Sequence, residues 1–515
     1  MNIKQAKTEI KNTIRAYLTR DELGNYLIPT IRQRPVLLMG PPGIGKTQIM
    51  EQIASETGVG LVAYTITHHT RQSAIGLPFI EHRTYDGREV TVTEYTMSEI
   101  LASVYNLMER TGLKEGILFL DEINCVSETL APMMLQFLQC KTFGNQALPE
   151  GWTIVAAGNP PAYNKSVRDF DVVTLDRVKR IDVEADFGVW KEYAQKKGLH
   201  GAIISYLDIK KDHFYRVETT VDGLQFATAR GWEDLSELLC AYEKLGLKAD
   251  RQVVEQYIQL PRIARDFANY LELYEKYQRT YQVDAILRGE WPRTTLSELR
   301  AAAFDERLSV LGLLLSRLSE SAGRARQQDE LTTALQEVLL TVREQISAGT
   351  EAVMALTEQT RKNQTELRKA KEAGQLSREQ RDAQMRVIQV LERYCQLLQG
   401  EENSNDGAMA RLRAWFGEEV KARKAAGEAA GVEFQNAFRF LEEAFGDSQE
   451  LVLFVTELTA TDNTSWFVEH FGCEAYFRHN QELLFDHTRH QIREEITAAR
   501  AQSATQEEGN HGHFA

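Results

Sequence analysis

The sequence predicts an α/β core, a helical lid over that core and an all-α C-terminal region. Three observations support this fold class. A glycine-rich loop follows a short apolar run near residue 40, later apolar runs of strand length end in polar residues, and helical spacing of apolar residues prevails from residue 187 onward. The chain has 515 residues, more than one hydrophobic core usually organises, so we expect two or three domains.

Composition narrows the class of protein. The apolar share of 43% and the charged share of 26% are ordinary for a soluble globular protein. The net charge of −14 disfavours a broad nucleic-acid or anionic-membrane surface. No apolar run is long enough to cross a bilayer, and residues 1–20 show no signal-peptide pattern. The odd, scattered set of cysteines indicates free thiols in a reducing compartment, so we expect a cytoplasmic protein: Cys125, Cys140, Cys240, Cys395 and Cys473.

A phosphate-binding loop is the strongest single motif. The apolar run 36–39 has the composition of a strand buried on both faces. It is followed by residues that fit G-x-x-x-x-G-K-[ST] at every fixed position: Gly40, Pro41, Pro42, Gly43, Ile44, Gly45, Lys46 and Thr47, with Gln48 next in the following helix. The glycines let backbone N–H groups surround an anion at a helix start. Lys46 can then reach the β- and γ-phosphates, and the Thr47 hydroxyl can hold Mg²⁺.

Two flanking elements are predicted beside this loop. Residues 1–26 have apolar residues at helical spacing, which predicts a leading helix packed against the core. The stretch 79–95 alternates polar and apolar residues around Asp86-Gly87, a strong signal for a β-hairpin. A hairpin inserted before the next helix indicates either an added functional element that reaches a pore or a partner, or an ordinary surface hairpin.

A pair of carboxylates ends the next buried strand. The run 116–120 is apolar after its glycine, and Asp121 and Glu122 follow it directly. Ligands of α/β proteins gather at the carboxyl ends of the strands. Asp121 is therefore predicted to bind Mg²⁺, and Glu122 to act as the general base that polarises the attacking water.

A third buried strand, 152–158, is followed by Asn159. We predict that the Asn159 amide contacts the γ-phosphate and the attacking water, rather than serving only as a turn residue before proline. Two arginines lie further on, Arg177 and Arg180, around the start of another strand. If subunits form a ring, Arg177 is the first choice and Arg180 the second for an arginine finger that reaches a neighbouring γ-phosphate. Either could instead pair with surface acids.

The order of these motifs resembles that of the AAA+ ATPases, and more closely the MoxR branch. The resemblance rests on Gly-Pro-Pro-Gly-Ile-Gly-Lys-Thr, Leu-Phe-Leu-Asp-Glu-Ile-Asn, Ala-Gly-Asn-Pro and Leu-Asp-Arg, and covers about residues 20–290. By this likeness the α/β core is a P-loop NTPase (AAA+) core, the hairpin is a helix-2 insertion, Asn159 is sensor 1 and Arg230 is a sensor 2 arginine at the start of a lid helix. The segment 160–171 departs from the family pattern, which leaves the finger open between Arg177 and Arg180.

The resemblance also implies an activity and partners. MoxR-type ATPases bind ATP and Mg²⁺, are generally thought to be chaperone-like remodelling motors, assemble as hexameric rings, and often work with a partner that carries a von Willebrand A domain. We therefore expect a homo-hexameric ring that hydrolyses ATP to remodel a partner protein, with Glu122, Asn159, Arg177 and Arg230 as its catalytic residues.

The rest of the chain is predicted to be helical. Residues 1–186 are expected to form the nucleotide-binding domain, 187–292 a lid helical throughout, 293–400 a bundle, 401–500 a second helical region and 501–515 a disordered tail. Gly323, Gly349 and Gly374 are expected to separate about four long helices, and residues 403–407 to form a loop. A zinc site among the C-terminal histidines and cysteine is the weaker hypothesis, because no second close-spaced pair is present: His470, Cys473, His479, His487 and His490.

Three functions remain open from the sequence. The first is the ATP-driven remodelling motor. The second is a nucleotide-gated assembly scaffold in which hydrolysis is slow, and particle size measured with and without nucleotide, beside a turnover assay, separates these two. The third is a nucleic-acid motor, against which stand the acidic charge and the absence of a recognisable nucleic-acid module.

Overall fold

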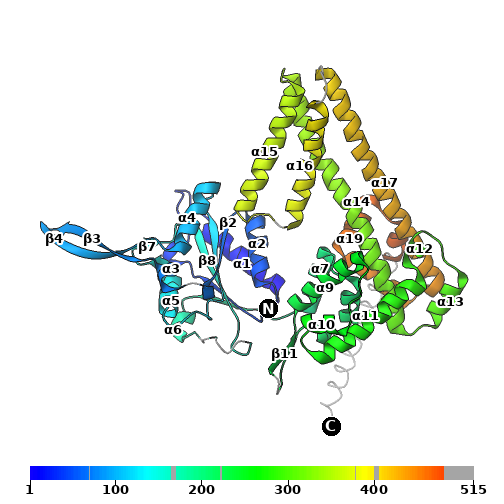
Figure 1. Ribbon diagram of the computed structural model, residues 1–515, viewed down its shortest axis with the longest axis horizontal. Coiled ribbons are helices and arrows are strands. Elements are labelled where there is room, and N and C mark those ends of the chain that lie inside the picture. Colours follow the sequence, from blue (N-terminus) through cyan, green and yellow to red (C-terminus); the bar gives the residue numbers. More distant parts are fainter. Residues whose placement is uncertain are drawn as a thin grey trace, which may run out of the picture.

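A five-stranded parallel sheet forms the centre of the N-terminal part (Figure 1). The computed structural model describes residues 1–68, 70–163, 167, 170–220, 223–376, 378–399 and 405–480. The strand order is β2-β5-β8-β1-β9 and every neighbouring pair is parallel, the strands being β1 (Val36–Met39), β2 (Gly60–Thr65), β5 (Gly116–Asp121), β8 (Trp152–Gly158) and β9 (Lys179–Asp182). The carboxyl ends of all five strands therefore lie at one edge. The predicted α/β P-loop class is confirmed.

Helices cover both faces of the sheet. One face packs against α1 (Ile3–Leu18) and α2 (Lys46–Thr57), and the other against α4 (Glu99–Thr111) and α5 (Ala131–Cys140). Short helices α3 (Arg71–Ile75) and α6 (Val172–Leu175) lie in the connections. The predicted leading helix 1–26 is wrong in its length. It stops at Leu18, and the Asp21 carboxylate then accepts bonds from the N–H groups of Leu23 and Asn25, which favours a turn over further helix.

The predicted hairpin is confirmed. β3 (Pro78–Tyr85) pairs antiparallel with β4 (Arg88–Tyr95), and Figure 1 shows this ribbon projecting away from the sheet. Asp86 and Gly87 both have positive φ, 48° and 76°, as the tight turn of a two-residue hairpin requires. A second, smaller hairpin, β6 (Thr142–Phe143) with β7 (Gln146–Ala147), lies near its base: Asn145 Nδ2 is hydrogen-bonded to Glu94.

The lid is mostly helical but not throughout. Its helices are α7 (Phe187–Lys197), α8 (Gly201–Ile209), α9 (Ala229–Leu245), α10 (Arg251–Tyr257), α11 (Pro261–Tyr281) and α12 (Val283–Leu287). The expectation of helix over the whole region is wrong, because β10 (Arg216–Thr220) and β11 (Gly223–Ala227) form a hairpin within it. The β-branched residues Val217, Thr219 and Thr220, followed by Gly223 at φ 117°, favour strand and turn there.

Long helices dominate the C-terminal part: α13 (Arg293–Ala301), α14 (Phe304–Ser347), α15 (Ala352–Glu372), α16 (Arg378–Gln399), α17 (Asn405–Phe445), α18 (Gln449–Ala460) and α19 (Asp462–Phe471). Gly349 and Gly374 separate helices as predicted. Gly323 does not: it lies inside α14, where an added Cβ would stand 3.0 Å from the Asn463 side chain, so the glycine serves close packing. The expected loop at 403–407 is wrong from Asn405 onward, where α17 begins.

Two hydrophobic clusters organise this helical part. One joins the lid to the lower parts of α14 and α17 and to α18 and α19. The other joins the upper parts of α14 and α17 to α15 and α16. We call the part formed by α15, α16 and the upper parts of α14 and α17 the arm; in Figure 1, α15 runs from its far tip back toward the core and α16 returns from the core to the tip. No helix of the described residues is long and apolar enough to cross a membrane. The predicted tail 501–515 lies outside the described residues, and so do His487 and His490.

Candidate nucleotide site

The Lys46 side chain links the phosphate loop to the end of β8. Its Nζ donates to the carbonyl oxygens of Gly40 at 2.9 Å and Pro41 at 2.8 Å, and to Oδ1 of Asn159 at 2.8 Å. The loop and Asn159 come together because β1 and β8 are neighbours whose carboxyl ends coincide. A lysine that is 8% exposed, surrounded by oxygens at a helix start, forms a strong anion site.

The protonation of Lys46 is perturbed by its surroundings. Burial lowers the pKa of Lys46 to about 8, with the positive charge of Arg230 acting in the same direction. The carboxylates of Asp121 and Glu122 act the other way. The charged form is therefore held less firmly than in an exposed lysine, and an incoming phosphate would supply the missing negative charge.

A hydroxyl and a carboxylate converge beside Lys46. Thr47 Oγ1 donates to Oδ2 of Asp121 at 2.9 Å, which joins the start of α2 to the end of β5. The other oxygen, Oδ1, accepts the backbone N–H of Glu122 at 2.9 Å. Mg²⁺ prefers such oxygen donors and usually keeps waters and substrate phosphates among its ligands, so these two side chains fit the ion.

Glu122 has a constrained backbone and a defined partner. Its φ of 56° is rare for a residue with a side chain and places the carboxylate in a sharp turn after β5. The Oε2 atom accepts a hydrogen bond from Thr67 Oγ1 at 2.8 Å. Sequence reasoning missed Thr67 as a site residue. The available signal was its position just past β2, at the same edge of the sheet as the other polar residues.

The lid reaches the phosphate loop at two points. Tyr215 donates its hydroxyl to the carbonyl of Pro42 at 2.9 Å. An added Cβ at Gly43 would stand 3.2 Å from Cβ of Arg230, so the first turn of α9 touches the loop. Arg230 is exposed and lies close enough to affect the charge of Lys46. Sequence reasoning found Arg230 but missed Tyr215, which follows no recognisable motif.

The two arginines proposed as fingers lie away from this cluster. Arg177 is exposed and bonds to Gln139, while Arg180 pairs with Asp182 on the same strand at 2.9 Å. Within the described chain neither arginine has a hydrogen bond or ion pair with the phosphate loop or with Asp121, Glu122 or Asn159.

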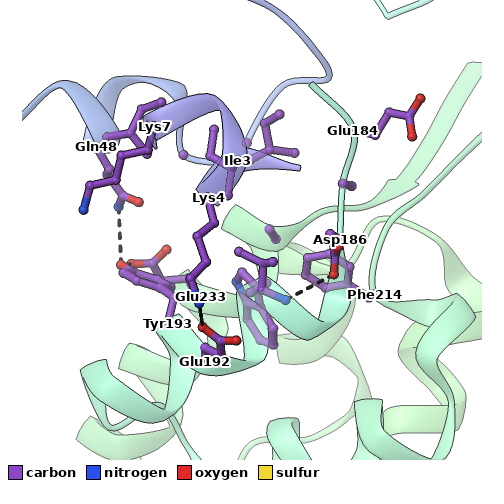
Figure 2. Close-up of a pocket in the computed structure, with 18 of the residues that line it drawn as sticks. Ile3, Lys4, Lys7, Gln48, Glu184, Asp186, Glu192, Tyr193, Phe214 and Glu233 are labelled. Atoms are coloured by element: carbon purple, nitrogen blue, oxygen red, sulfur yellow. Dashed lines mark hydrogen bonds and ion pairs between the residues drawn. The ribbon is translucent and has the colours of Figure 1, made fainter. Parts of the chain in front are cut away.

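A cavity of about 190 Å³ adjoins the phosphate loop (Figure 2). It lies between α1, the start of α2 and the lid helices α7 and α9. Figure 2 shows Lys4 extending from α1 to Glu192 on α7, an ion pair of 2.6 Å, and Gln48 facing Tyr193. The wall of the cavity is part apolar and part polar, and the residues that form it include Ile3, Ile44, Trp190, Phe214, Tyr193 and Glu233.

Three of the residues considered for a C-terminal zinc site have other surroundings in the structure. His470 Nδ1 lies 2.9 Å from the carbonyl of Trp466, His479 Nε2 lies 2.7 Å from Oε1 of Glu442, and Cys473 is buried in the helical core. In the described parts of the chain, no group of three His, Cys, Asp or Glu side chains is placed to hold a metal ion.

Comparison with known proteins identifies the core. Residues 35–178 match the family model described as AAA domain (dynein-related subfamily). This range contains the sheet from β1 to β8 and both the phosphate loop and the carboxylate pair. A search of curated proteins finds no match to the chain. The family match, together with the parallel sheet and the loop at its edge, supports an AAA+ ATPase domain in this part of the chain.

Proposed function

We propose that the chain is a Mg²⁺-dependent ATPase of the MoxR type that works in an oligomeric ring and remodels a protein partner. One observation carries the proposal: Lys46, Thr47, Asp121, Glu122 and Asn159 converge at the carboxyl edge of one sheet. These are the groups that hold phosphate, hold a divalent cation and activate water in phosphoryl transfer. The AAA domain match supports the ATPase part.

Each residue has a proposed role in hydrolysis. The loop from Gly40 to Gln48 holds the phosphates, and Lys46 turns from the loop carbonyls toward the β- and γ-phosphate oxygens. Mg²⁺ held by Thr47 and Asp121 would neutralise charge on the phosphates. Glu122 accepts the proton of the attacking water, and Asn159 orients that water and the γ-phosphate. The purine base fits the adjoining cavity, because its wall combines apolar faces with polar edges.

The exposure of the candidate finger arginine supports the proposed ring. Among the described residues of one chain, Arg230 of the lid lies at the site, whereas Arg177 bonds to Gln139 instead. Arg177 is exposed and would have to exchange its bond to Gln139 for a neighbour's γ-phosphate, where an arginine finger stabilises transition-state charge. We propose a homo-hexameric ring. The proposed location is the cytoplasm, because the five cysteines are free thiols.

Exposed apolar side chains on the β3–β4 ribbon support the proposed contact with a partner protein. The β3–β4 ribbon carries Phe79, Ile80, Tyr85 and Val90 at exposed positions, and it projects from the core (Figure 1). A two-stranded ribbon gains little from standing alone in water, so these side chains suit contact with another protein. The proposed partner is the protein to be remodelled or an adaptor, with a von Willebrand A domain protein as the candidate implied by the MoxR resemblance.

Substitution of the proposed base tests the function. Glu122→Gln keeps the shape of the side chain but cannot accept a proton, so ATP should bind while turnover falls about a hundredfold or more. The matched control is Glu150→Gln, the same chemical change at an exposed residue before β8, at the opposite edge of the sheet. Turnover is measured as phosphate release, and binding with a fluorescent ATP analogue. Wild-type turnover in Glu122→Gln removes Glu122 from the role.

Particle size measured in the same samples separates motor from scaffold. If ATP changes the size of the particle while the wild-type chain shows no turnover that Glu122→Gln abolishes, the nucleotide-gated scaffold replaces the motor. If the chain binds no adenine nucleotide with or without Mg²⁺, the proposed function is wrong.

A further inference from the structure

Asn124 connects the loop after β5 to the end of β8. It lies two residues beyond Glu122 and is 3% exposed. Its Nδ2 donates to the backbone carbonyl of Asn159 at 2.8 Å. The adjacent residue adds a second link, since the N–H of Ile123 donates to the carbonyl of Ala157 at 2.9 Å. The turn that carries Glu122 is therefore tied to the segment that carries Asn159.

Gly158 leaves space for this side chain. A Cβ added at Gly158 would stand 2.6 Å from Oδ1 of Asn124 and 2.9 Å from its Cγ. Real Cβ contacts are never this short, so the Asn124 amide occupies the volume that any other residue at position 158 would need. With asparagine at position 124, position 158 therefore accommodates only glycine without a shift.

The other end of the amide has no partner. Oδ1 of Asn124 is buried and accepts no hydrogen bond from the described residues. Burying an unpaired amide oxygen is unfavourable, and a link needed only for packing could be made by an apolar side chain of similar size. An asparagine at this position therefore provides something that an apolar residue cannot. This is either the Nδ2 donor that holds the Asn159 carbonyl, or an acceptor that is used during the reaction.

We propose that Asn124 is a positioning residue for ATP hydrolysis. It fixes the backbone of Asn159, whose side chain meets Lys46, at a set position relative to Glu122. The proposed general base Glu122 follows β5, and the proposed water-orienting residue Asn159 follows β8. Asn124 joins the ends of these two strands close to both residues. The inference rests on the proposed ATPase function. Among the described residues, Asn124 is not part of the cavity wall and bonds to the Asn159 backbone, so its loss should affect the rate of the chemical step more than the affinity for ATP.

Two substitutions remove the link in different ways. Asn124→Asp keeps the shape but replaces the donor by an oxygen that repels the Asn159 carbonyl. Gly158→Ala keeps the donor but displaces it. Each should lower kcat about tenfold or more while KM and the Kd for a fluorescent ATP analogue stay within about twofold. Asn106→Ala, an exposed asparagine on α4, is the matched control and should change neither quantity.

A double-mutant cycle distinguishes positioning from general loss of stability. In an Asn124→Ala background the two closest contacts of the added Cβ, to Oδ1 and Cγ of Asn124, are gone and the nearest remaining atom is Sδ of Met39, at 3.1 Å, so adding Gly158→Ala should cost much less kcat than it does in the wild-type background. Full additivity of the two losses overturns the proposal, as does an Asn124→Asp variant that binds ATP and turns over at the wild-type rate. If the wild-type chain itself does not hydrolyse ATP, both the proposed function and this inference fall. If it does and the variants match it, only the role of Asn124 falls.

Discussion

At the scale of single residues, the central feature of the candidate site is a buried lysine whose hydrogen bonds are made within the protein. Lys46 bonds to two loop carbonyls and to Asn159, in a setting that destabilises its charge. In the proposed complex, phosphate oxygens of ATP would replace these neutral acceptors, and binding would stabilise the charged form of Lys46. The affinity for ATP and the protonation of Lys46 are therefore linked.

This linkage predicts a pH dependence of ATP affinity. The pKa of Lys46 is about 8 in the free site, and bound phosphate raises it, so binding takes up a proton above that pH. The Kd should be nearly constant near pH 7 and should rise by up to about tenfold per pH unit above pH 8. Lys46→Arg stays charged throughout and should bind more weakly with a flat profile. A flat wild-type Kd, measured by fluorescent nucleotide titration, contradicts the linkage.

The sequence was informative about residues with fixed motif spacing. Motif spacing predicts Lys46, Thr47, Asp121 and Asn159 at the carboxyl edge of the sheet. In the structure Lys46 bonds to Asn159, and Thr47 bonds to Asp121. Thr67 and Tyr215 could not be found in this way, because their contacts depend on the register of β2 and on where the lid hairpin lies. Such contacts follow from tertiary packing, which local spacing does not encode.

At the scale of elements, the β3–β4 ribbon shows how local signals succeed. Asp-Gly fixes a tight turn, and the alternating strands on either side fix the register from Pro78↔Tyr95 to Tyr85↔Arg88. The lid hairpin β10–β11 was missed because its short β-branched run lies between strong helical patterns. Gly323 was misread because a helix accepts glycine where another chain segment packs closely against it.

The ribbon should be dispensable for the stability of the core. None of the hydrophobic clusters includes a residue of β3 or β4. Replacing residues 80–93 by Asn-Gly leaves the Phe79↔Glu94 pair to close a minimal turn. The unfolding temperature should change by less than about 4 °C, and basal ATP turnover by less than about twofold. Calorimetry and phosphate release provide the measurements.

A larger fall of the unfolding temperature would indicate that the ribbon has a structural role. A fall of the unfolding temperature by more than about 10 °C would show that the ribbon contributes to the core. Full basal turnover with loss of stimulation by a co-purified protein would instead assign it to partner contact, as proposed.

At the scale of the whole molecule, the α15–α16 hairpin returns to the core far from where the arm begins. Ala373 accepts a hydrogen bond from the N–H of Leu61 at 3.3 Å, and Gln375 Nε2 donates to the carbonyl of Gly58 at 2.9 Å. β2 is an edge strand, so the turn of the hairpin covers part of its free edge. Figure 1 shows the lower ends of α15 and α16 beside β2 and α2.

This contact closes a loop within one chain. The core leads to the lid, the lid shares a hydrophobic cluster with α14, and α15–α16 leads from α14 back to the core. The sequence could not predict it, because residues 363–380 are largely polar and the contact spans more than three hundred positions. If the lid rotates against the core during the proposed turnover, that rotation must bend the arm or break this contact.

Locking the contact should therefore slow the proposed ATPase. A Cβ added at Gly374 would stand 3.4 Å from Cβ of Leu61, close to the separation of about 3.8 Å found in disulfides, so Leu61→Cys with Gly374→Cys should cross-link under mild oxidation. The cysteine at 374 must adopt a φ of 68°, a strain that the Gly374→Cys single variant measures separately. The oxidised pair should retain ATP binding but lose about tenfold or more of its turnover, and reduction should restore it. Each single variant under the same oxidant should keep its rate. A cross-linked pair that turns over as fast as its reduced form would show that the arm moves with the core throughout the cycle, and that lid rotation is either absent or absorbed within α14.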